Sequence, residues 1–482
     1  MLRHISKGSD RSPVGRLAEA TIHRERRVSA PPKNQIHTKG IFKLFIALVS
    51  AIGLQAADTL DWQALPPIPY DLGVAGPFTG VHDDHLIVAG GANFPEPVWE
   101  NDKVWRDTIY ALPLGETSAV WSIAGKLPRP MGYGACVSLP EGIVCIGGND
   151  ANQTYADVFL IKWANGDVTI EPLPAIPETL CYGTATLLGD YIYVAGGSTG
   201  LGLETAQKNF WRLDWSKRGD RNSFQWESLA AWPGPERVLN SAVTQNNGEN
   251  DCIYVMGGRR ISPDGEIEFL KDVYEFNPHR SDAPWKRRTD LPQPRMAGTA
   301  VALGQSHIAL LAGDDGSLFT QADALKDEHP GFTKTIYTYH TITDTWIESG
   351  QMPQNQVTTH AVKSGDNIFL ASGEVRPRVR TPSVWKLSLH KSDVAFPAGN
   401  WAAIILYLGA VMGIAFYFAR RNQGTDDFFR GGQRIPGWVA GLSIFATMLS
   451  SITFIAIPAR AFATDWSFII LNVGILVCAP LV

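Results

Sequence analysis

One carboxylate and three arginines fall within the segment Gly373-Glu374-Val375-Arg376-Pro377-Arg378-Val379-Arg380-Thr381. A carboxylate can take a proton from a hydroxyl group and return it, and guanidinium groups bind anions through paired hydrogen bonds. The residues alone leave two interpretations open. Glu374 is either a proton-transfer group or a solvated loop acid, and the arginines form either an anion site or a solvated basic face.

This segment lies in the last of six repeats. In each repeat an apolar strand, such as Leu86–Ala89 or Ile192–Ala195, ends in glycine. The interval of about 50 to 60 residues is typical of propeller blades. The pattern predicts an all-β, six-bladed kelch-type β-propeller, in which loops from every blade meet around one central mouth. The glycine positions are Gly90-Gly91, Gly147-Gly148, Gly196-Gly197, Gly257-Gly258, Ala312-Gly313 and Gly373.

Two further strands complete each repeat. A third strand follows each glycine, and most repeats then end in a strand that opens with tryptophan (Trp121, Trp226, Trp285 and Trp346), whereas one uses Val168–Pro172. The last repeat has no such strand after Trp385, but Asp61–Pro66 has the missing pattern. We expect Asp61–Pro66 to complete the last blade and close the ring, which removes long open edges. We expect the tryptophans to pack between blades rather than to bind ligand.

Other loops are expected at the same mouth. Asn93 and Phe94 follow the first glycine pair, and Asn149 and Arg259 directly follow later pairs. His360 begins the inner strand of the last blade and is a candidate second acid. Structural roles such as turn capping are an open alternative for all of these residues. The substrate-binding candidates are Arg376, Asn93, Phe94, Arg295, Arg237, Tyr133 and His360.

Composition limits the partners and cofactors. A net charge of −5 at pH 7 gives no reason to propose a nucleic acid. Five cysteines cannot all pair, and Cys136 and Cys145 fall on adjacent strands of one predicted hairpin. These two are either a cross-strand disulfide or two small buried residues. No Cys-x-x-Cys motif or histidine cluster with metal-ligand spacing occurs, so the propeller is expected to need no cofactor.

The N-terminal region has the features of an export segment. Residues 1–40 hold nine lysines and arginines and only three acids, and the apolar run Ile41–Leu54 follows. A basic region, a short apolar core and small residues are typical of a secretory signal. We expect either a cleaved signal peptide or an uncleaved anchor. Both send the propeller out of the cytoplasm.

The C-terminal region is expected to span a membrane. Trp401–Ala419 is uncharged and long enough to cross a bilayer, and Ile435–Ala459 and Trp466–Val482 are further uncharged runs. Arginines at 420, 421, 430 and 434 mark the loop after the first run as cytoplasmic by the positive-inside rule. Because the chain ends inside the third run, we expect a fragment of a larger transporter. The predicted domains are a leader and signal or anchor (1–57), a propeller (58–390), a linker (391–400) and transmembrane segments (401–482).

The repeats resemble the N-acetylneuraminate (sialic acid) mutarotase/epimerase family, which folds as a six-bladed kelch propeller. Residues 373–381 and 90–94 carry the resemblance, with support from Arg295–Gly298 and Tyr133-Gly134. The glutamate segment is mid-chain in the family's usual form and near the end in this sequence, so the chain is similar to a cyclically permuted branch. The resemblance implies that Glu374 is the catalytic acid/base, with Arg380 as carboxylate or transition-state partner.

Residues 401–482 resemble the start of the sodium:solute symporter family, especially its members that transport sialic acid. Phe445–Pro458 is similar to that family's first core helix, and Trp401–Ala419 is similar to its extra leading helix. The resemblance implies a sodium ion bound by backbone carbonyls and a substrate contact nearby, while the remaining symporter helices are absent from this chain. The residues concerned are Ala446 and Leu449 for Na⁺, and Ser450 and Thr453 for substrate.

These features together predict a periplasmic sialic-acid mutarotase fused to a sodium symporter for the same sugar acid. The expected location is a bacterial inner membrane, with the propeller outside the cytoplasm, and the expected partners are a small sugar acid and the lipid bilayer. Two alternatives stay open. The propeller either binds and delivers sugar without catalysis, or acts as a mutarotase on a neutral sugar.

Overall fold

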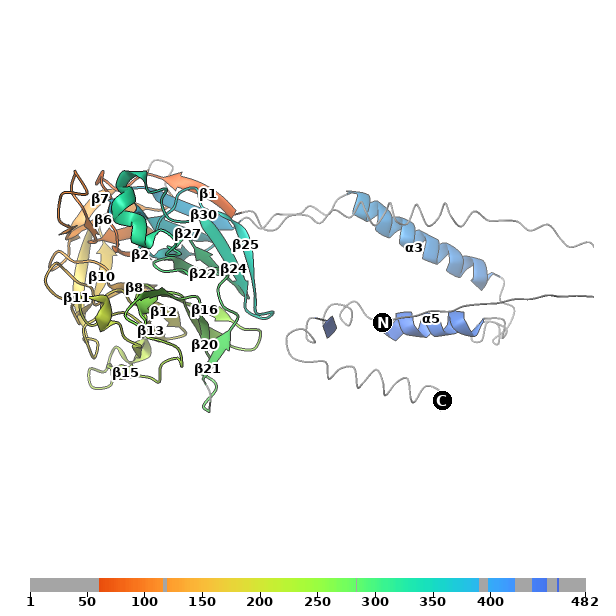
Figure 1. Cartoon of the computed structure of the whole chain (residues 1–482). Coiled ribbons are helices and arrows are strands. Elements are labelled where there is room, and N and C mark those ends of the chain that lie inside the picture. The colour runs from red at the N-terminus through yellow and green to blue at the C-terminus, as the bar shows by residue number, and fades with distance from the viewer. Residues whose placement is uncertain are drawn as a thin grey trace, which may run out of the picture. The chain divides into compact units, whose positions relative to one another are not determined.

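A computed structural model of the chain describes residues 60–115, 119–282, 284–389, 398–420, 436–448 and 457–458. Six four-stranded antiparallel sheets are arranged around one axis (Figure 1). Their inner strands contact one another in the order β2, β8, β12, β16, β22 and β26, and β26 contacts β2 again. The predicted six-bladed propeller is therefore confirmed.

Each blade runs from an inner strand near the axis to an outer strand at the rim. The first is β2 (Phe78–His82), β3 (His85–Ala89), β6 (Thr108–Pro113) and β7 (Ser122–Lys126). The second is β8 (Ala135–Leu139), β9 (Gly142–Ile146), β10 (Val158–Ala164) and β11 (Asp167–Leu173). The third is β12 (Thr184–Leu188), β13 (Tyr191–Ala195), β14 (Phe210–Asp214) and β15 (Trp226–Ser228).

The other three blades follow the same plan. The fourth is β16 (Ser241–Asn246), β17 (Asp251–Met256), β20 (Val273–Phe276) and β21 (Trp285–Arg288). The fifth is β22 (Thr299–Leu303), β23 (His307–Leu311), β24 (Thr335–His340) and β25 (Thr345–Gln351). The sixth is β26 (Ala361–Ser364), β27 (Asn367–Ala371), β30 (Val384–Leu389) and β1 (Leu60–Leu65).

The first strand of the chain closes the ring. β1 pairs antiparallel with β30, in register from Leu60 opposite Leu389 to Leu65 opposite Val384. Leu60 and Trp62 pack against the cluster between the fifth and sixth blades. The predicted closure is confirmed, because β1 occupies the outer position that the sixth repeat lacks.

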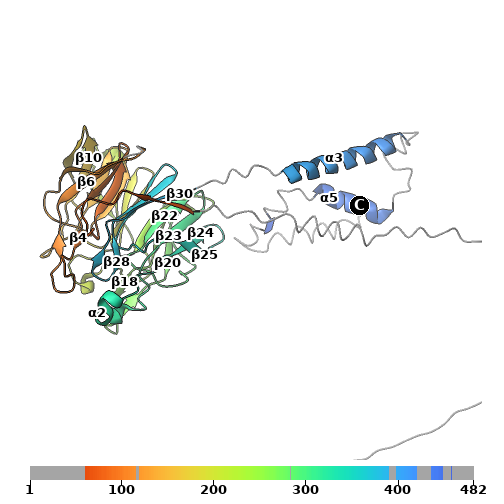
Figure 2. The same cartoon turned by 90° about the horizontal axis from the view of Figure 1, so that it is seen from above.

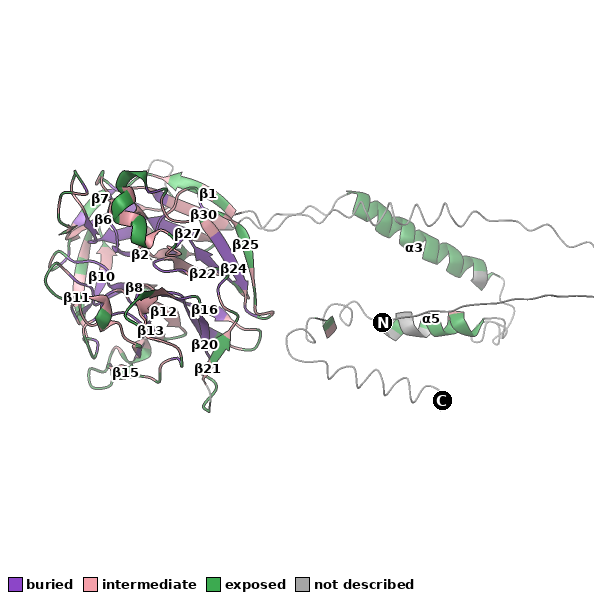
Figure 3. Ribbon diagram, in the orientation of Figure 1, coloured by how far each residue is buried: buried purple, intermediate pink, exposed green. Residues whose placement is uncertain are grey.

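The hydrophobic cores lie between neighbouring blades. Phe78 of the first blade and Phe159 of the second, for example, pack edge to face with ring centroids 5.8 Å apart. Buried strands accordingly fill the interior of the ring and exposed segments lie at its rim (Figure 3). The outer-strand tryptophans link the blades, since each indole N–H donates to a carbonyl of the preceding blade. These bonds are Trp121 to Pro66, Trp226 to Pro174, Trp285 to Ala230 and Trp346 to Thr289. The tryptophans are structural, as predicted.

The two cysteines of the predicted hairpin lie directly opposite each other on β8 and β9. Both Cys136 and Cys145 are buried free thiols. The structure therefore shows the second of the two interpretations, in which these are small buried residues.

Hairpins and short helices extend from the loops between the second and third strands of the blades, and we call the face that carries them the upper face. β4, β18, β28 and α2 lie together on it (Figure 2). The hairpins are β4 (Ala92–Asn93) with β5 (Val104–Trp105), β18 (Arg259–Ile261) with β19 (Ile267–Phe269), and β28 (Glu374–Arg376) with β29 (Val379–Arg380). The short helices on this face are η1 (Leu203–Thr205), η3 (Phe319–Gln321), α2 (Ala322–Leu325) and η4 (Lys326–Glu328). A further short helix, η2 (Trp215–Lys217), lies between the third and fourth strands of the third blade.

Six residues, one from each blade, form a closed ring of backbone hydrogen bonds. Each N–H donates to the carbonyl of the counterpart in the preceding blade at 2.7–2.8 Å, and the Gly76 N–H closes the ring on Thr358. All six have φ between 53° and 64°, a left-handed conformation that is uncommon outside glycine. The closed set of hydrogen bonds holds them in it. This axial ring consists of Gly76, Tyr133, Tyr182, Leu239, Ala297 and Thr358.

The C-terminal region contributes α3 (Ala398–Ala419) and α5 (Gly437–Met448). Among the described residues, α3 alone is long and apolar enough to cross a membrane, judged by length and composition. It matches the first predicted run, and α5 lies within the second. Ala446 lies in α5, where only its backbone is described. The predicted export segment, the arginine loop after Arg420, the third run and the sites at Leu449, Ser450 and Thr453 lie outside the described residues.

Candidate active site

The β28–β29 hairpin brings Glu374 and Arg380 together. They are six residues apart in the chain but directly opposite each other across the hairpin. The Arg380 Nη1 donates to Glu374 Oε1 at 2.6 Å, and the Arg378 backbone N–H donates to the same oxygen at 2.9 Å. The side chain of Arg380 is only 3% exposed and that of Glu374 is 15% exposed. Burial alone would lower the pKa of Arg380, but the charges and hydrogen bonds of Glu374 and Tyr133 together outweigh it and raise that pKa.

The glycine before Glu374 makes this placement possible. Gly373 has φ of 118°, and a Cβ there would meet the Val357 carbonyl oxygen at 2.8 Å. Glu374 in turn forms an antiparallel bridge with Val357, just before the axial ring. Glycine therefore lets the chain approach the axial ring closely, so that the Glu374 backbone lies beside that ring.

The other two arginines of residues 373–381, Arg376 and Arg378, contact neighbouring loops rather than Glu374 with their side chains. Arg376 pairs with Asp327 at 2.8 Å and also donates to its carbonyl, which ties the hairpin to the loop of short helices. Arg378 donates to the carbonyls of Val98 and Asn101 at 2.8 and 2.7 Å. Arg376 does not line the cavity described next, so the structure shows for it a surface ion pair rather than the predicted substrate contact.

A cavity of about 330 Å³ opens above the axial ring on the upper face. Its size is within the range of small-molecule sites. The predicted site residues that line it are Phe94, Tyr133, Glu374 and Arg380, and Arg259, which was expected at the mouth, lines it too. The lining residues that the sequence did not single out as site candidates include Lys103, Tyr182, Ser198, Asp314, Phe319, His329 and Arg378.

The residue after the last glycine of each repeat occupies the same place in every blade. Each one bridges to the residue just before the axial ring, as Glu374 does. These six residues are Ala92, Asn149, Ser198, Arg259, Asp314 and Glu374. The three charged members come from consecutive blades, with Asp314 between Arg259 and Glu374. Repeat position alone would have identified Asp314, because it follows Gly313 as Glu374 follows Gly373.

Asp314 differs from Glu374 in its surroundings. Its carboxylate accepts one backbone hydrogen bond, from Gly316 N–H at 2.9 Å, and forms no ion pair within the described residues. Burial raises the pKa of Asp314, and the charges of Asp315 and Glu374 add to this, partly opposed by Gly316 N–H and Arg259. The cavity therefore contains one carboxylate that is paired with an arginine and another, without such a partner among the described residues, whose pKa is raised by burial.

Two basic side chains line the cavity without a carboxylate partner in the described part of the chain. Arg259 packs over the Phe319 ring at 5.3 Å, and burial lowers its pKa. Its Nε is buried without a hydrogen-bond partner. Lys103 lies over three aromatic rings, those of Phe94, Trp105 and Tyr133, at 4.9 to 5.9 Å. An anion would be the natural complement to these groups.

Comparisons with known proteins identify the family of the propeller. The profile of a family described as N-acetylneuraminate epimerase matches residues 47–170 and 173–329, more than half of the chain. The chain belongs to the N-acetylneuraminate epimerase family. The matched residues end before β28, so the family match does not test the roles predicted for Glu374 and Arg380.

Relatives of two kinds occur. The chain is 55% identical over 76 residues to the sodium/sialic acid symporter NanT of Aliivibrio fischeri, covering 16% of this chain and 15% of the symporter. It is 27% identical over 259 residues to the N-acetylneuraminate epimerase of Yersinia enterocolitica, covering 48% of this chain and 60% of that protein. The chain thus spans less than two thirds of each. It joins an epimerase-family propeller to a segment similar to sialic acid symporters.

A solved structure shares the fold. The structure of YjhT superposes with a TM-score of 0.51 at 14% sequence identity, covering 68% of this chain and 98% of that one. At this identity the likeness shows the propeller fold alone.

Three predicted substrate contacts lie away from the cavity. Arg237 is fully buried and forms a bidentate ion pair with Asp272 at 2.8 and 2.9 Å. Arg295 is 4% exposed and donates to the Pro294 carbonyl. Asn93 is buried, donates to the Gly73 carbonyl and accepts from Arg106. None of the three predicted contacts lines the cavity. Sequence spacing placed them near the mouth, but their side chains are buried among other contacts and do not reach the cavity.

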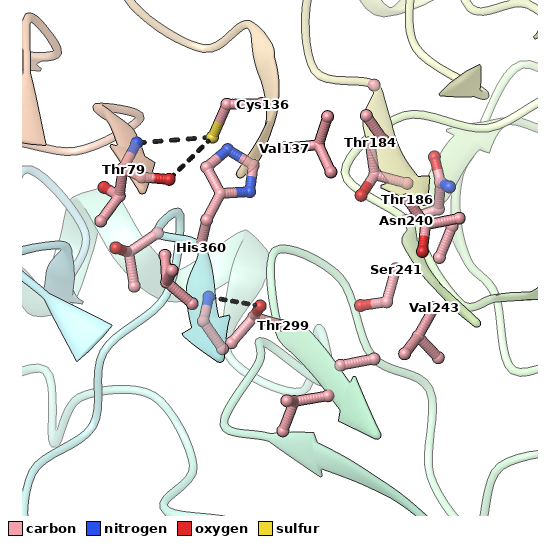
Figure 4. A pocket seen from close by; sticks show the side chains of 18 of the residues that line it. Thr79, Cys136, Val137, Thr184, Thr186, Asn240, Ser241, Val243, Thr299 and His360 are labelled. Carbon is pink, nitrogen blue, oxygen red and sulfur yellow. Dashed lines mark hydrogen bonds between the residues drawn. The ribbon is translucent and has the colours of Figure 1, made fainter. Parts of the chain in front are cut away.

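His360 lies in a second cavity. This space of about 430 Å³ lies among the inner strands and shares axial-ring residues with the site cavity, so the ring separates the two. His360 lies beside Cys136 there (Figure 4), and its Nε2 is 3.3 Å from the Gly134 carbonyl oxygen. His360 does not line the cavity of Glu374. The structure therefore does not place His360 beside Glu374, as its predicted role of a second acid requires.

Proposed function

We propose that the propeller interconverts the anomers of N-acetylneuraminate or a closely related sugar acid. One observation carries the proposal: two carboxylates at equivalent positions of neighbouring blades share one cavity but have contrasting surroundings. Glu374 is paired with Arg380 at 2.6 Å, whereas burial raises the pKa of Asp314. Two carboxylates placed in contrasting environments within one site are typical of acid–base catalysis. The names of the family and of both relatives support a sialic acid as the substrate.

The reaction needs one base and one acid. Glu374 takes the proton from the anomeric hydroxyl while the bond from the anomeric carbon to the ring oxygen breaks. Asp314 gives its proton to that ring oxygen, which leaves an open-chain ketone. After rotation about the neighbouring carbon–carbon bond, Asp314 recovers a proton from the hydroxyl and Glu374 returns one to the carbonyl oxygen. The ring is then closed on the other face, and both carboxyl groups are restored.

Arg380 positions the base. Its guanidinium holds one Glu374 oxygen, whereas the other oxygen has only a long contact of 3.4 Å, with the Thr358 hydroxyl. Oε2 is therefore the oxygen that we assign to proton transfer. The Phe94 ring covers Arg380 at 5.0 Å and shields the ion pair from water.

The membrane part belongs to the same proposal. We assign residues 401–482 to the opening segment of a sodium-coupled symporter for the same sugar acid, and α3 to a membrane span with the propeller outside the cytoplasm. The symporter likeness and the apolar character of α3 support this. Na⁺ at Ala446 and Leu449, and substrate at Ser450 and Thr453, stay predictions.

Exchange spectroscopy tests the enzymatic part. The full chain in detergent should speed the exchange of proton signals between the two anomers of N-acetylneuraminate, and Glu374→Gln and Asp314→Asn should each suppress it. A propeller that binds the sugar acid without changing the exchange rate would instead be a delivery module. Acceleration with N-acetylmannosamine but not with N-acetylneuraminate would indicate a neutral-sugar enzyme.

A further inference from the structure

The site cavity contains an arginine that the acid–base mechanism does not use. Arg259 begins β18 and projects from the repeat position next to that of Asp314. It has no ion pair and no side-chain hydrogen bond within the described residues, and its Nε is buried. A partly buried guanidinium without an acceptor is costly, because its charge loses hydration without compensation. Such a side chain is expected where a ligand supplies the missing anion.

The other arginines around the cavity are already occupied. Arg380 is bound to Glu374, Arg378 to two backbone carbonyls and Arg376 to Asp327. Lys103 also forms no ion pair with a carboxylate in the described part of the chain, but it lies over aromatic rings and offers a single ammonium group. Only a guanidinium presents two parallel donors to a carboxylate. Of the cavity's described cations, Arg259 is therefore best suited to hold one.

Position supports the same conclusion. In a sialic acid the carboxylate is attached to the anomeric carbon, which is the reacting atom of the proposed function. Its anchor must therefore lie next to the acid–base pair. Arg259, Asp314 and Glu374 occupy the same repeat position in three consecutive blades and line one cavity.

We infer that Arg259 binds the carboxylate on the anomeric carbon of the substrate and so restricts this site to sugar acids. The inference rests on the proposed function for the identity of the sugar, but it concerns binding rather than catalysis. It also moves the predicted contact with the substrate carboxylate from Arg380 to Arg259, because the Arg380 guanidinium is bound to Glu374.

Binding measurements with an acid and its ester test this directly. The full chain in detergent is titrated calorimetrically with N-acetylneuraminate and with its methyl ester, in which the carboxylate is neutral. The wild type should bind the acid about 10- to 100-fold more tightly, the range expected for hydrogen bonds to a charged group. Arg259→Met should lose this preference and bind both ligands weakly. Arg259→Lys should recover part of it.

The next residue offers a matched control. Arg260 carries the same charge but pairs with Glu268 at 2.6 Å and Glu236 at 3.4 Å outside the cavity. Arg260→Met should keep the wild-type preference. Arg259→Met should also melt no lower than the wild type, because it removes an unpaired, partly desolvated charge while methionine can still pack on the Phe319 ring.

Two results would overturn the inference: an Arg259→Met variant that still prefers the acid as the wild type does, or a Lys103→Met variant that alone abolishes the preference. These outcomes are separate from the fate of the proposed function. A wild type that binds the acid through Arg259 but leaves the anomer exchange rate unchanged refutes the catalysis and supports the anchor. If the wild type accelerates anomer exchange but Arg259→Met still prefers the acid over the ester, the catalysis is supported and the anchor is refuted.

Discussion

The substitution Glu374→Gln tests the central step of the mechanism, because it removes proton affinity while preserving shape. The carboxylate accepts hydrogen bonds from Arg380, from the Arg378 backbone and, at longer distance, from Thr358. A glutamine oxygen can keep the first two of these bonds. It cannot take a proton from the sugar, so we expect the rate of anomer interconversion to fall about 10²- to 10⁴-fold.

The same substitution has a cost in stability that the structure lets us bound. The Arg380 side chain is 3% exposed and would lose the carboxylate that balances its charge. Breaking a buried ion pair costs about 3–5 kcal/mol. A neutral hydrogen bond of about 0.5–1.5 kcal/mol offsets part of this. We therefore expect the free energy of unfolding to fall by about 2–4 kcal/mol, which leaves most domains folded.

The assay must separate these two effects. Anomer exchange is measured by NMR spectroscopy at a temperature below the variant's own melting transition, and the rate is expressed per folded protein. Arg376→Met is the control for disturbance of the hairpin. It lies in the same segment, but its partner Asp327 is 67% exposed, so the lost pair contributes less than about 1 kcal/mol. This control should keep near-wild-type turnover.

The reasoning would be refuted by a folded Glu374→Gln variant that turns over within tenfold of the wild type. A loss of rate in Arg376→Met as large as that in Glu374→Gln would also refute it. In that case the position of the hairpin, rather than the carboxylate of Glu374, would control the reaction.

Other parts of the molecule lead to three more expected outcomes. Asp314→Asn should slow anomer exchange about 10²- to 10⁴-fold by removing the acid. Because burial raises the pKa of Asp314, ionisation of this carboxyl group destabilises the folded wild type as the pH rises through that pKa. The variant should therefore melt at a higher temperature than the wild type at pH 7.5, and this difference should disappear below pH 4. Equal differences at both pH values would contradict a raised pKa of Asp314. A chain that starts at Tyr70 should lose roughly 2–5 kcal/mol in the free energy of unfolding of the propeller, since Leu60, Trp62 and Leu65 of β1 are partly buried in the closing blade. Identical thermal melts of the shortened and full chains would contradict the conclusion that β1 stabilises the ring by closing it. A cysteine introduced by Asn422→Cys should resist an impermeant thiol reagent in intact cells, whereas Asp264→Cys on the propeller should react; the opposite labelling pattern would reverse the orientation.

Repetition made much of the fold readable from the sequence. Glycine pairs after apolar strands recur because each blade makes the same turn near the axis, and the tryptophans recur because each one links its blade to the preceding one. The incomplete sixth repeat and the orphan strand Asp61–Pro66 together predicted the closure that β1 and β30 show. The sequence placed Glu374 and Arg380 in one loop, but their direct opposition depends on the irregular register of the β28–β29 hairpin, in which Arg376 lies opposite Val379.

Only the tertiary structure decided which polar residues line the cavity and which make structural contacts. Sequence spacing placed Arg237, Arg295, Asn93 and His360 near the mouth, but it does not tell which way a side chain points or what it meets. Asp272 neutralises Arg237, and the axial ring separates His360 from Glu374. Asp314 and Arg259 gain their roles because consecutive blades bring one repeat position into a single cavity. Local sequence thus determined the strands and turns, whereas closure of the ring determined which charges meet, because that depends on contacts between residues far apart in the chain.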